Sequence, residues 1–148
     1  MSHFPSGKVE SELIKQILKD GITPVLHGDV VFDDLKGVRI MSGDEILSEL
    51  GKKLDADQFI FATDGDGIFD IENSGKPIKE IDKVGMEKLV DKISKDGSGH
   101  DVTGGFWGKV KWCLKYVPKN GIRIVDGNSI SKLENGLLKN DGGTLILP

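Results

Sequence analysis

Helical and strand patterns alternate along the whole sequence, and this alternation restricts the folds that the chain can adopt. Apolar residues at helical spacing recur in several segments, and short apolar runs typical of strands lie between them. Strands separated by helices favour an α/β protein, here a three-layer αβα sandwich with a largely parallel central sheet. The unbroken run 59–62 is typical of a central parallel strand, and 30–32 with 38–41 suit a hairpin or a crossing loop. The predicted helices are 9–18, 46–54, 86–93, 110–117 and 130–138, and the predicted strands are 24–26, 30–32, 38–41, 59–62, 122–125 and 145–147.

Composition and charge exclude several classes of protein. The chain has 148 residues, of which 37% are hydrophobic and 30% charged, as in one soluble domain or part of a larger one. Its net charge of −4 argues against binding to nucleic acids or anionic membranes. No apolar run approaches the roughly 20 residues that span a bilayer. A single cysteine, Cys113, excludes an internal disulfide and suits a reducing cytoplasm.

Glycine is the unusual residue of this sequence. The 20 glycines are about twice the usual share of roughly 7% and show no collagen-like period. We expect them in turns and in loops that approach a ligand closely. In α/β sheets such loops follow the carboxyl ends of the strands. Three clusters that combine glycine with charged residues are therefore the candidate sites.

The first cluster, Ser42–Glu45, lies at a predicted strand-to-helix turn. The Asp44 carboxylate is expected at the carboxyl edge of the sheet, where it could orient a lysine or a magnesium ion. The alternative is an ordinary helix start, since the helix dipole favours acidic side chains there.

The second cluster, Thr63–Gly67, directly follows a predicted strand. Its carboxylates and glycines suit a nucleotide or a metal, but Ile68 stands at the fifth position of an EF-hand loop and excludes a calcium site of that type. Asp70 likewise stands where a dinucleotide fingerprint needs Gly or Ala. A strand followed by Asp-x-Asp-Gly resembles the first motif of haloacid-dehalogenase-type phosphatases, in which Asp64 would be a nucleophile and Asp66 a proton donor. A plain Asp-Gly turn is the alternative.

The third cluster, Asp101–Lys109, contains successive glycines before a predicted helix. Such a loop lets backbone N–H groups converge on an anion, and the helix adds its positive end. Lys109 is electrostatically unfavourable in a first helical turn, so a facing phosphate would explain it. The loop is not a Walker A motif, because Thr103 and Val110 stand where that motif needs Gly and Ser or Thr. A flexible glycine loop is the alternative.

Taken together, the three clusters resemble the amino acid kinase superfamily. The sequence is most similar to the isopentenyl phosphate kinases, which are similar to the fosfomycin resistance kinases. The resemblance implies a carbamate kinase-like fold and an ATP-dependent transfer that converts isopentenyl phosphate to isopentenyl diphosphate in isoprenoid biosynthesis. The matching segments keep the family's order and spacing over nearly the whole chain: 24–30, 41–44, 63–69, 101–105 with 108–109, and 142–144.

The resemblance also implies a role for each site residue. Asp44 organises the active-site lysines and Lys109 neutralises charge on the transferred phosphoryl group, so these two are the candidate catalytic residues. The stretch Thr63–Phe69 holds the adenosine end of ATP, and Gly105 with Lys109 contacts its phosphates. ATP and Mg2+ are the implied cofactors, with no protein-borne metal site. The candidate substrate-binding residues are Gly28, Gly43 and Asp44, and the candidate nucleotide-binding residues are Thr63, Asp64, Gly65, Asp66, Gly67, Phe69, Gly104, Gly105 and Lys109.

The resemblance covers the C-terminal, nucleotide-binding half of the family. The lysine-bearing first strand, the glycine-rich phosphate loop and the substrate-gripping histidine of the family's first lobe have no counterpart in the 148 residues. We therefore expect a truncated chain, an incomplete reading frame or one piece of a split enzyme, nearly inactive alone. We expect it to form a homo-oligomer or to pair with a chain that supplies the first lobe. Two other functions stay open: a haloacid-dehalogenase-type phosphatase and a nucleotide-binding module without catalysis.

Overall fold

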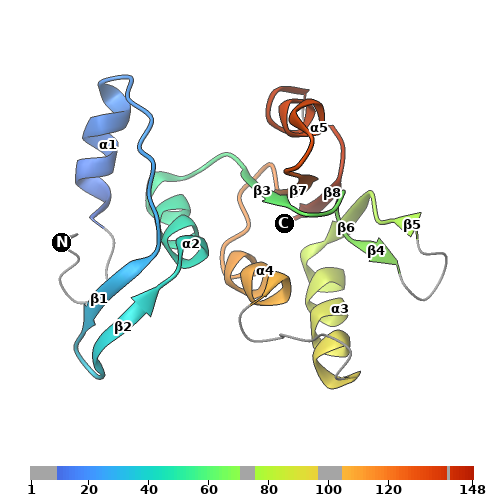
Figure 1. Ribbon diagram of the computed structural model, residues 1–148, viewed down its shortest axis with the longest axis horizontal. Helices are drawn as coiled ribbons and strands as arrows, with labels where there is room; N and C mark the ends of the chain where they lie inside the picture. Colours follow the sequence, from blue (N-terminus) through green and yellow to red (C-terminus); the bar gives the residue numbers. More distant parts are fainter. Residues whose placement is uncertain (1–9, 71–75, 97–104, 140) are drawn as a thin grey trace. The chain divides into compact units, whose positions relative to one another are not determined.

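The computed structural model describes residues 10–70, 76–96, 105–139 and 141–148, and the chain divides into two compact units (Figure 1). Unit 1 is Met1–Ala56 and unit 2 is Asp57–Pro148. The sequence has no Gly-, Pro- or Ser-rich linker at this boundary. Asp55 ends the last helix of unit 1 in a left-handed conformation (φ 52°).

Unit 1 consists of two helices and a hairpin. The predicted helix 9–18 is confirmed as α1, and Gly21 (φ +75°) ends it as predicted by donating its N–H to the carbonyl of Leu18. The predicted hairpin and the helix that follows it are also confirmed. The elements are α1 (Ser11–Lys19), β1 (Asp29–Asp33), β2 (Gly37–Met41) and α2 (Gly43–Leu54).

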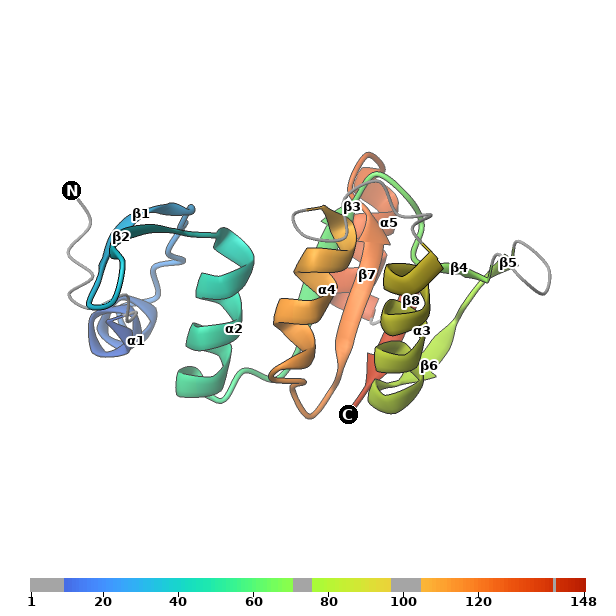
Figure 2. The ribbon, with the colours of Figure 1, turned by 90° about the horizontal axis from the view of Figure 1, so that it is seen from below.

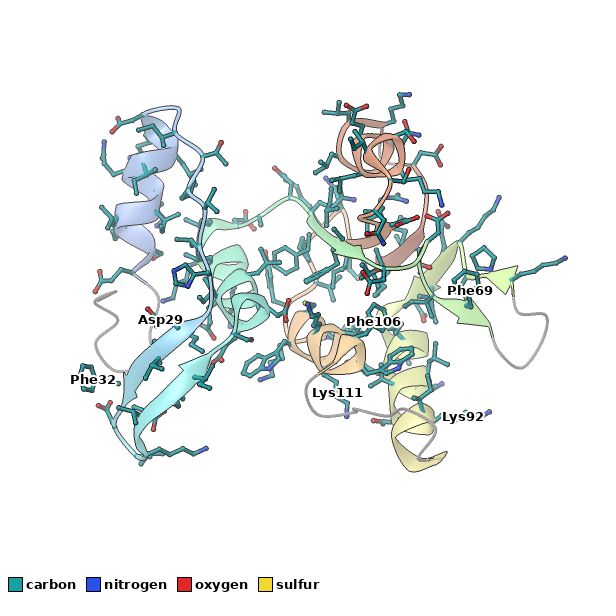
Figure 3. The ribbon with its side chains drawn as sticks, viewed as in Figure 1. Asp29, Phe32, Phe69, Lys92, Phe106 and Lys111 are labelled. Atoms are coloured by element: carbon teal, nitrogen blue, oxygen red, sulfur yellow. The ribbon has the colours of Figure 1, made fainter. Side chains whose placement is uncertain are left out.

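The hairpin of unit 1 has one buried and one exposed face. The antiparallel register pairs Val30 with Ile40 and Phe32 with Val38, so these four apolar side chains share a face, and all are exposed. Phe32 points away from the hairpin (Figure 3). The opposite face packs on the helices, and the buried core of unit 1 is Ile14, Val31, Met41, Ile46 and Leu50.

The predicted buried strand 24–26 is wrong. These residues have no strand structure, and Val25 is 93% exposed. A strand needs a neighbour for its backbone N–H and C=O groups. In the described part of unit 1, β1 and β2 pair with each other, and neither pairs with this segment.

Unit 2 contains a four-stranded sheet in the order β3-β7-β8-β6. Two of its pairings, β3 with β7 and β6 with β8, are parallel, and β7 with β8 is antiparallel. The expectation of a largely parallel sheet is confirmed, but β3 lies at the edge of this sheet rather than at its centre. The strands are β3 (Phe59–Thr63), β6 (Glu80–Asp82), β7 (Ile122–Asp126) and β8 (Thr144–Leu147).

Helices cover both faces of this sheet, which confirms the three-layer architecture (Figure 2). The helices α3 (Lys83–Asp96) and α4 (Phe106–Leu114) lie on one face, and α5 (Ile130–Glu134) lies on the other and continues into a π-helical turn. Because both faces are covered, the side chains of β7 are buried on both faces of the sheet, from residue 122 to 125.

A small hairpin of unit 2 has no clear signal in the sequence. Its strands β4 (Phe69–Asp70) and β5 (Lys76–Pro77) pair antiparallel. Each strand has two residues, too few for a period to be recognised. The predicted loop 95–105 lies largely outside the described residues, although Asp96 still belongs to α3. In the described part of the chain, every helix is too short or too polar to cross a membrane.

Candidate functional site

The loop that follows β3 is shaped by its own hydrogen bonds. The Thr63 hydroxyl donates to the carbonyl of Gly65 (2.9 Å), and the N–H of Gly67 donates to the same carbonyl (3.0 Å). Gly67 has φ +92°, a conformation in which a side chain would be strained. The sequence Asp-Gly-Asp-Gly therefore folds as a tight turn that connects β3 to β4.

Bonds to distant segments hold this loop on the sheet. The N–H of Gly127, after β7, donates to the carbonyl of Thr63 (2.8 Å). The N–H of Ile68 donates to the hydroxyl of Thr144 (2.8 Å), a side chain that is 0% exposed. Both ends of the loop are thus fixed to neighbouring strands.

A pocket of about 450 Å³ opens between this loop and α4. Six of the predicted nucleotide-binding residues meet there, together with Ala62 and Phe106. Phe69 comes from β4 and Phe106 from the first position of α4 (Figure 3). The six predicted residues that line the pocket are Thr63, Asp64, Gly65, Gly67, Phe69 and Lys109.

The start of α4 gives the pocket a positive wall. Gly105 occupies the N-cap position in an extended conformation and has no side chain to cap the first N–H groups. The first turn carries no acidic residue, and the exposed Lys109 lies on its pocket side. The backbone N–H groups of the first turn, the helix dipole and an ammonium together favour an anion at this end of the pocket. Gly104 lies outside the described residues.

Phe106 is a pocket residue that the sequence analysis did not select. Its ring meets that of Trp107 edge-to-face at 5.0 Å, and it also lines a small apolar space beneath α4. Its position directly after Gly105, at the start of a helix, is the sequence feature that could have identified it as a pocket residue. An apolar ring at the first helical position is unusual unless it covers a neighbouring surface.

Asp66 faces away from the residues that line this pocket. Its Oδ2 lies 3.1 Å from the Nζ of Lys132 on α5, and Lys132 also reaches Asp126 at 3.4 Å. The hydrogen bond with Asp66 is the largest cause that raises the pKa of Lys132. The other oxygen of Asp66, Oδ1, is buried and has no hydrogen-bond partner among the described residues. Asp66 lines a second pocket of about 310 Å³, with Arg123 among its walls.

The predicted substrate-binding residues lie in unit 1, around the start of α2. A Cβ on Gly28 would come within 2.8 Å of the Met41 carbonyl and 3.2 Å of the Gly43 nitrogen, so Gly28 packs directly on this turn. Ser42 caps α2 by accepting from the N–H of Glu45 (3.2 Å). Asp44 is half-buried in the first turn. Gly28 and Gly43 are therefore brought together, and their binding of a substrate stays a prediction.

Asp44 and Lys109, the two predicted catalytic residues, belong to different units. Their joint role stays a prediction. The structure describes two local sites: a glycine-lined turn with a carboxylate in unit 1, and a pocket with a positive wall in unit 2.

Sequence comparisons match this chain to known kinases. Residues 5–125 match the amino acid kinase family. The isopentenyl phosphate kinase of Methanocaldococcus jannaschii is 40% identical over 93% of this chain and 50% of its own length. That of Thermoplasma acidophilum is 32% identical over 82% of this chain and 49% of its own length. The chloroplastic acetylglutamate kinase of Arabidopsis thaliana is 31% identical over 95% of this chain. The chain thus spans about half the length of the isopentenyl phosphate kinases that it matches.

Solved structures show the same fold. The T. acidophilum isopentenyl phosphate kinase product complex has a TM-score of 0.67 at 23% identity, over 97% of this chain and 55% of that one. Carbamate kinase from Giardia lamblia bound to citric acid has a TM-score of 0.63 at 19% identity, over 94% of this chain and 43% of that one. The expectation of a carbamate kinase-like α/β fold is confirmed.

Proposed function

We propose that this chain, which belongs to the amino acid kinase family, is the nucleotide-binding half of an ATP-dependent kinase of the isopentenyl phosphate kinase type. The reaction transfers the terminal phosphoryl group of ATP to isopentenyl phosphate and yields isopentenyl diphosphate and ADP. The observation that carries the proposal is the unit 2 pocket, in which the loop after β3 meets the positive start of α4 and Lys109.

The pocket offers different chemistry to the two ends of a nucleotide. Thr63, Asp64 and Phe69 would hold the adenosine end with hydroxyl, carboxylate and aromatic groups, and Phe106 adds a second apolar surface. The phosphates would lie at the N-terminus of α4 beside Lys109. Phosphoryl transfer needs chiefly positioning and charge stabilisation, which a helix end and an ammonium supply. Mg2+ would arrive on the phosphates, because it is usually bound through them and few protein ligands.

The acceptor is expected at the unit 1 turn. Gly28 and Gly43 leave room for a phosphate to approach the backbone, and Asp44 would orient lysines around the transferred group. Acetylglutamate kinases also match this chain. The choice of isopentenyl phosphate therefore rests on the 40% identity to the M. jannaschii enzyme and on the Ser42-Gly43-Asp44 motif.

A haloacid-dehalogenase-type phosphatase fits the structure poorly. That chemistry needs Asp64 and Asp66 to face one substrate phosphate. Here Asp64 lines the pocket with Lys109, whereas Asp66 pairs with Lys132 and lines the second pocket. A nucleotide-binding module without catalysis is the second candidate, since the unit 2 pocket could hold a nucleotide without any contribution from Asp44.

Nucleotide binding by the 148-residue chain tests the proposal. Calorimetry with ATP and Mg2+ should show weak binding, and Lys109→Ala should weaken it by about tenfold, the loss of one charge-assisted contact. AMP should be affected less, because it lacks the phosphates that Lys109 would contact. Lys111→Ala is the matched control, since Lys111 lies on the same helix but lines a different pocket. Absence of binding at several millimolar ATP, or equal losses in both variants, contradicts the site.

The reaction is tested separately. Addition of isopentenyl phosphate or N-acetylglutamate to the chain with ATP, and measurement of ADP, distinguishes a kinase from a binding module. We expect binding with little turnover by this chain alone, because the family's histidine and first lysine have no counterpart in it. ADP formation specific to isopentenyl phosphate would identify the acceptor; phosphate release from ester substrates without ATP would favour the phosphatase.

A further inference from the structure

We propose that Thr144 is a positioning residue for the nucleotide pocket: its buried hydroxyl fixes the height of the loop Thr63–Phe69 above the sheet. This inference rests on the proposed function of that pocket. Thr144 is not among the residues that line the pocket. Its role is exerted through the backbone of Ile68.

One hydroxyl connects three segments of the chain. The Thr144 oxygen accepts the N–H of Ile68 (2.8 Å) and donates its own hydrogen to the carbonyl of Ile78 (2.6 Å). The N–H of Ile78 in turn donates to the carbonyl of Ile68 (2.7 Å). The three residues form a closed ring of hydrogen bonds, and every member is satisfied by another. Removal of the hydroxyl would leave the buried N–H of Ile68 and the half-buried carbonyl of Ile78 without this partner.

The ring acts directly on the pocket wall. Ile68 lies between Gly67 and Phe69, and both of these neighbours line the pocket. Gly67 also rests on Thr144, since a Cβ there would lie 2.5 Å from the Thr144 hydroxyl oxygen and 2.7 Å from its nitrogen. The side chain of Ile68 is itself buried. The loop is therefore held from below by one residue, at the point where it turns towards Phe69.

Thr144 is itself held rigidly. It is the first residue of β8 and pairs with Ile124 in the register of the sheet. The preceding Gly143 has φ +61°, and a Cβ there would overlap the carbonyl of Ile124. The glycine lets the chain enter β8 in close contact with β7. A support on a packed strand positions a site more accurately than one on a loop.

The test compares Thr144→Val, which keeps the shape and removes the hydroxyl, with Thr144→Ser, which keeps the hydroxyl. Ile146→Val is the control for a general loss of stability, because Ile146 is a buried residue of the same strand. Amide exchange of Ile68 is measured without nucleotide, and ATP affinity by calorimetry. We expect Thr144→Val to speed Ile68 exchange and to weaken ATP binding, each by about tenfold. Thr144→Ser should stay within about twofold of the original chain in both readouts, and Ile146→Val should change neither.

Two outcomes would overturn the proposal: unchanged Ile68 exchange in Thr144→Val, or equal effects in Ile146→Val. If Thr144→Val does not fold, Gly67→Ala tests the same contact with the hydroxyl intact, and it should weaken ATP binding while global unfolding stays cooperative. The exchange readout needs no nucleotide. It therefore decides the role of Thr144 in holding the loop even if the original chain binds no ATP, a result that would contradict the proposed function instead.

Discussion

The two units of this chain cover their strands differently. In unit 2, helices lie on both faces of the sheet, and β7 is buried from Ile122 to Val125 (Figure 2). In unit 1, the hairpin buries Val31 and Met41 on one face and leaves the apolar Val30 and Phe32 exposed on the other. Both sets of strands carry apolar residues on two faces. Among the described residues, helices cover both faces of the unit 2 sheet but only one face of the unit 1 hairpin.

This difference identifies a candidate surface for association. Strands with apolar residues on both faces are typical of sheets that are covered on both. An exposed face with Val30, Phe32, Val38 and Ile40 is the kind of patch that usually has a partner. We propose that the chain associates through this face, either with a second copy or with a chain that supplies the family's first lobe.

The largest effect is expected from a matched pair of phenylalanine substitutions. Phe59 is 2% exposed and packs edge-to-face on Tyr116, whereas Phe32 is 69% exposed. Phe59→Ala should lower the free energy of unfolding of unit 2 by about 3–5 kcal/mol. In dilute solution, where the chain does not associate, Phe32→Ala should change that of unit 1 by less than about 0.5 kcal/mol. Urea unfolding followed by amide NMR signals in each unit measures both. Similar losses at the two sites would mean that the hairpin face is covered in solution.

Association of the chain gives the next prediction. Sedimentation at micromolar concentration should show species larger than one 148-residue chain. Phe32→Ser with Ile40→Ser should weaken this association by about tenfold or more, because both side chains lie on the exposed face. Leu138→Ser is the control, since Leu138 is 81% exposed but lies in unit 2. A single monomeric species of the original chain, well folded on heating, would show that the face needs no partner.

The third prediction concerns the charges that hold the hairpin to α2. The Arg39 guanidinium contacts Glu45 at 2.9 Å through two nitrogens, and Glu45 is buried. Arg39→Met would leave this carboxylate without its main partner and should destabilise unit 1 by about 1–3 kcal/mol. Lys15→Met, which breaks the exposed pair with Glu12, is the control and should have little effect. Equal effects would mean that burial of Glu45 does not matter.

Local patterns predicted the elements that carry the unit 2 pocket. The run Phe59–Ala62 identified β3, and the apolar spacing from Val110 identified α4, although this helix begins earlier than predicted, at Phe106. The strand 24–26 failed because an apolar run becomes a strand only with a partner, and pairing is non-local. The same limit misplaced β3 at the centre of the sheet.

The residues that support the pocket were harder to predict. Thr144 lies 76 positions from Ile68, and a threonine in a strand gives no local sign of a distant bond. Lys132 likewise contacts Asp66 across the sheet from α5. The direction of Asp66 follows from the turn at Gly67, which the sequence shows only as a glycine. The candidate site residues that follow a strand were therefore predictable from the sequence. The distant residues that hold them in place were not.

The smallest expected effect is a difference in pH response between the two units. In the β1–β2 turn, the backbone N–H groups of Lys36 and Leu35 donate to the Asp33 carboxylate, and Arg39 lies 3.1 Å away. These contacts, the Lys36 bond first, lower the pKa of Asp33. A lowered folded-state pKa means that the contribution is complete above the unfolded value of about 3.9 and is lost as the pH falls through the folded value.

Lys132 in unit 2 behaves in the opposite sense. Its pKa is raised by Asp66, so its contribution is complete below the unfolded value of about 10.4 and is lost only as the pH rises through the folded value. Acidification from about pH 5 should therefore loosen the hairpin turn, whereas the Lys132 contact should weaken only at high pH, as the pH rises through the raised pKa of Lys132. NMR signals of the Leu35 and Lys36 amides report the first event, and that of Lys132 the second. Asp33→Asn should remove the Asp33 titration from the turn and leave unit 2 unchanged. If the turn amides of Asp33→Asn still shift with the original midpoint, another carboxylate is responsible, and the acid sensitivity of unit 1 does not reside in its hairpin turn.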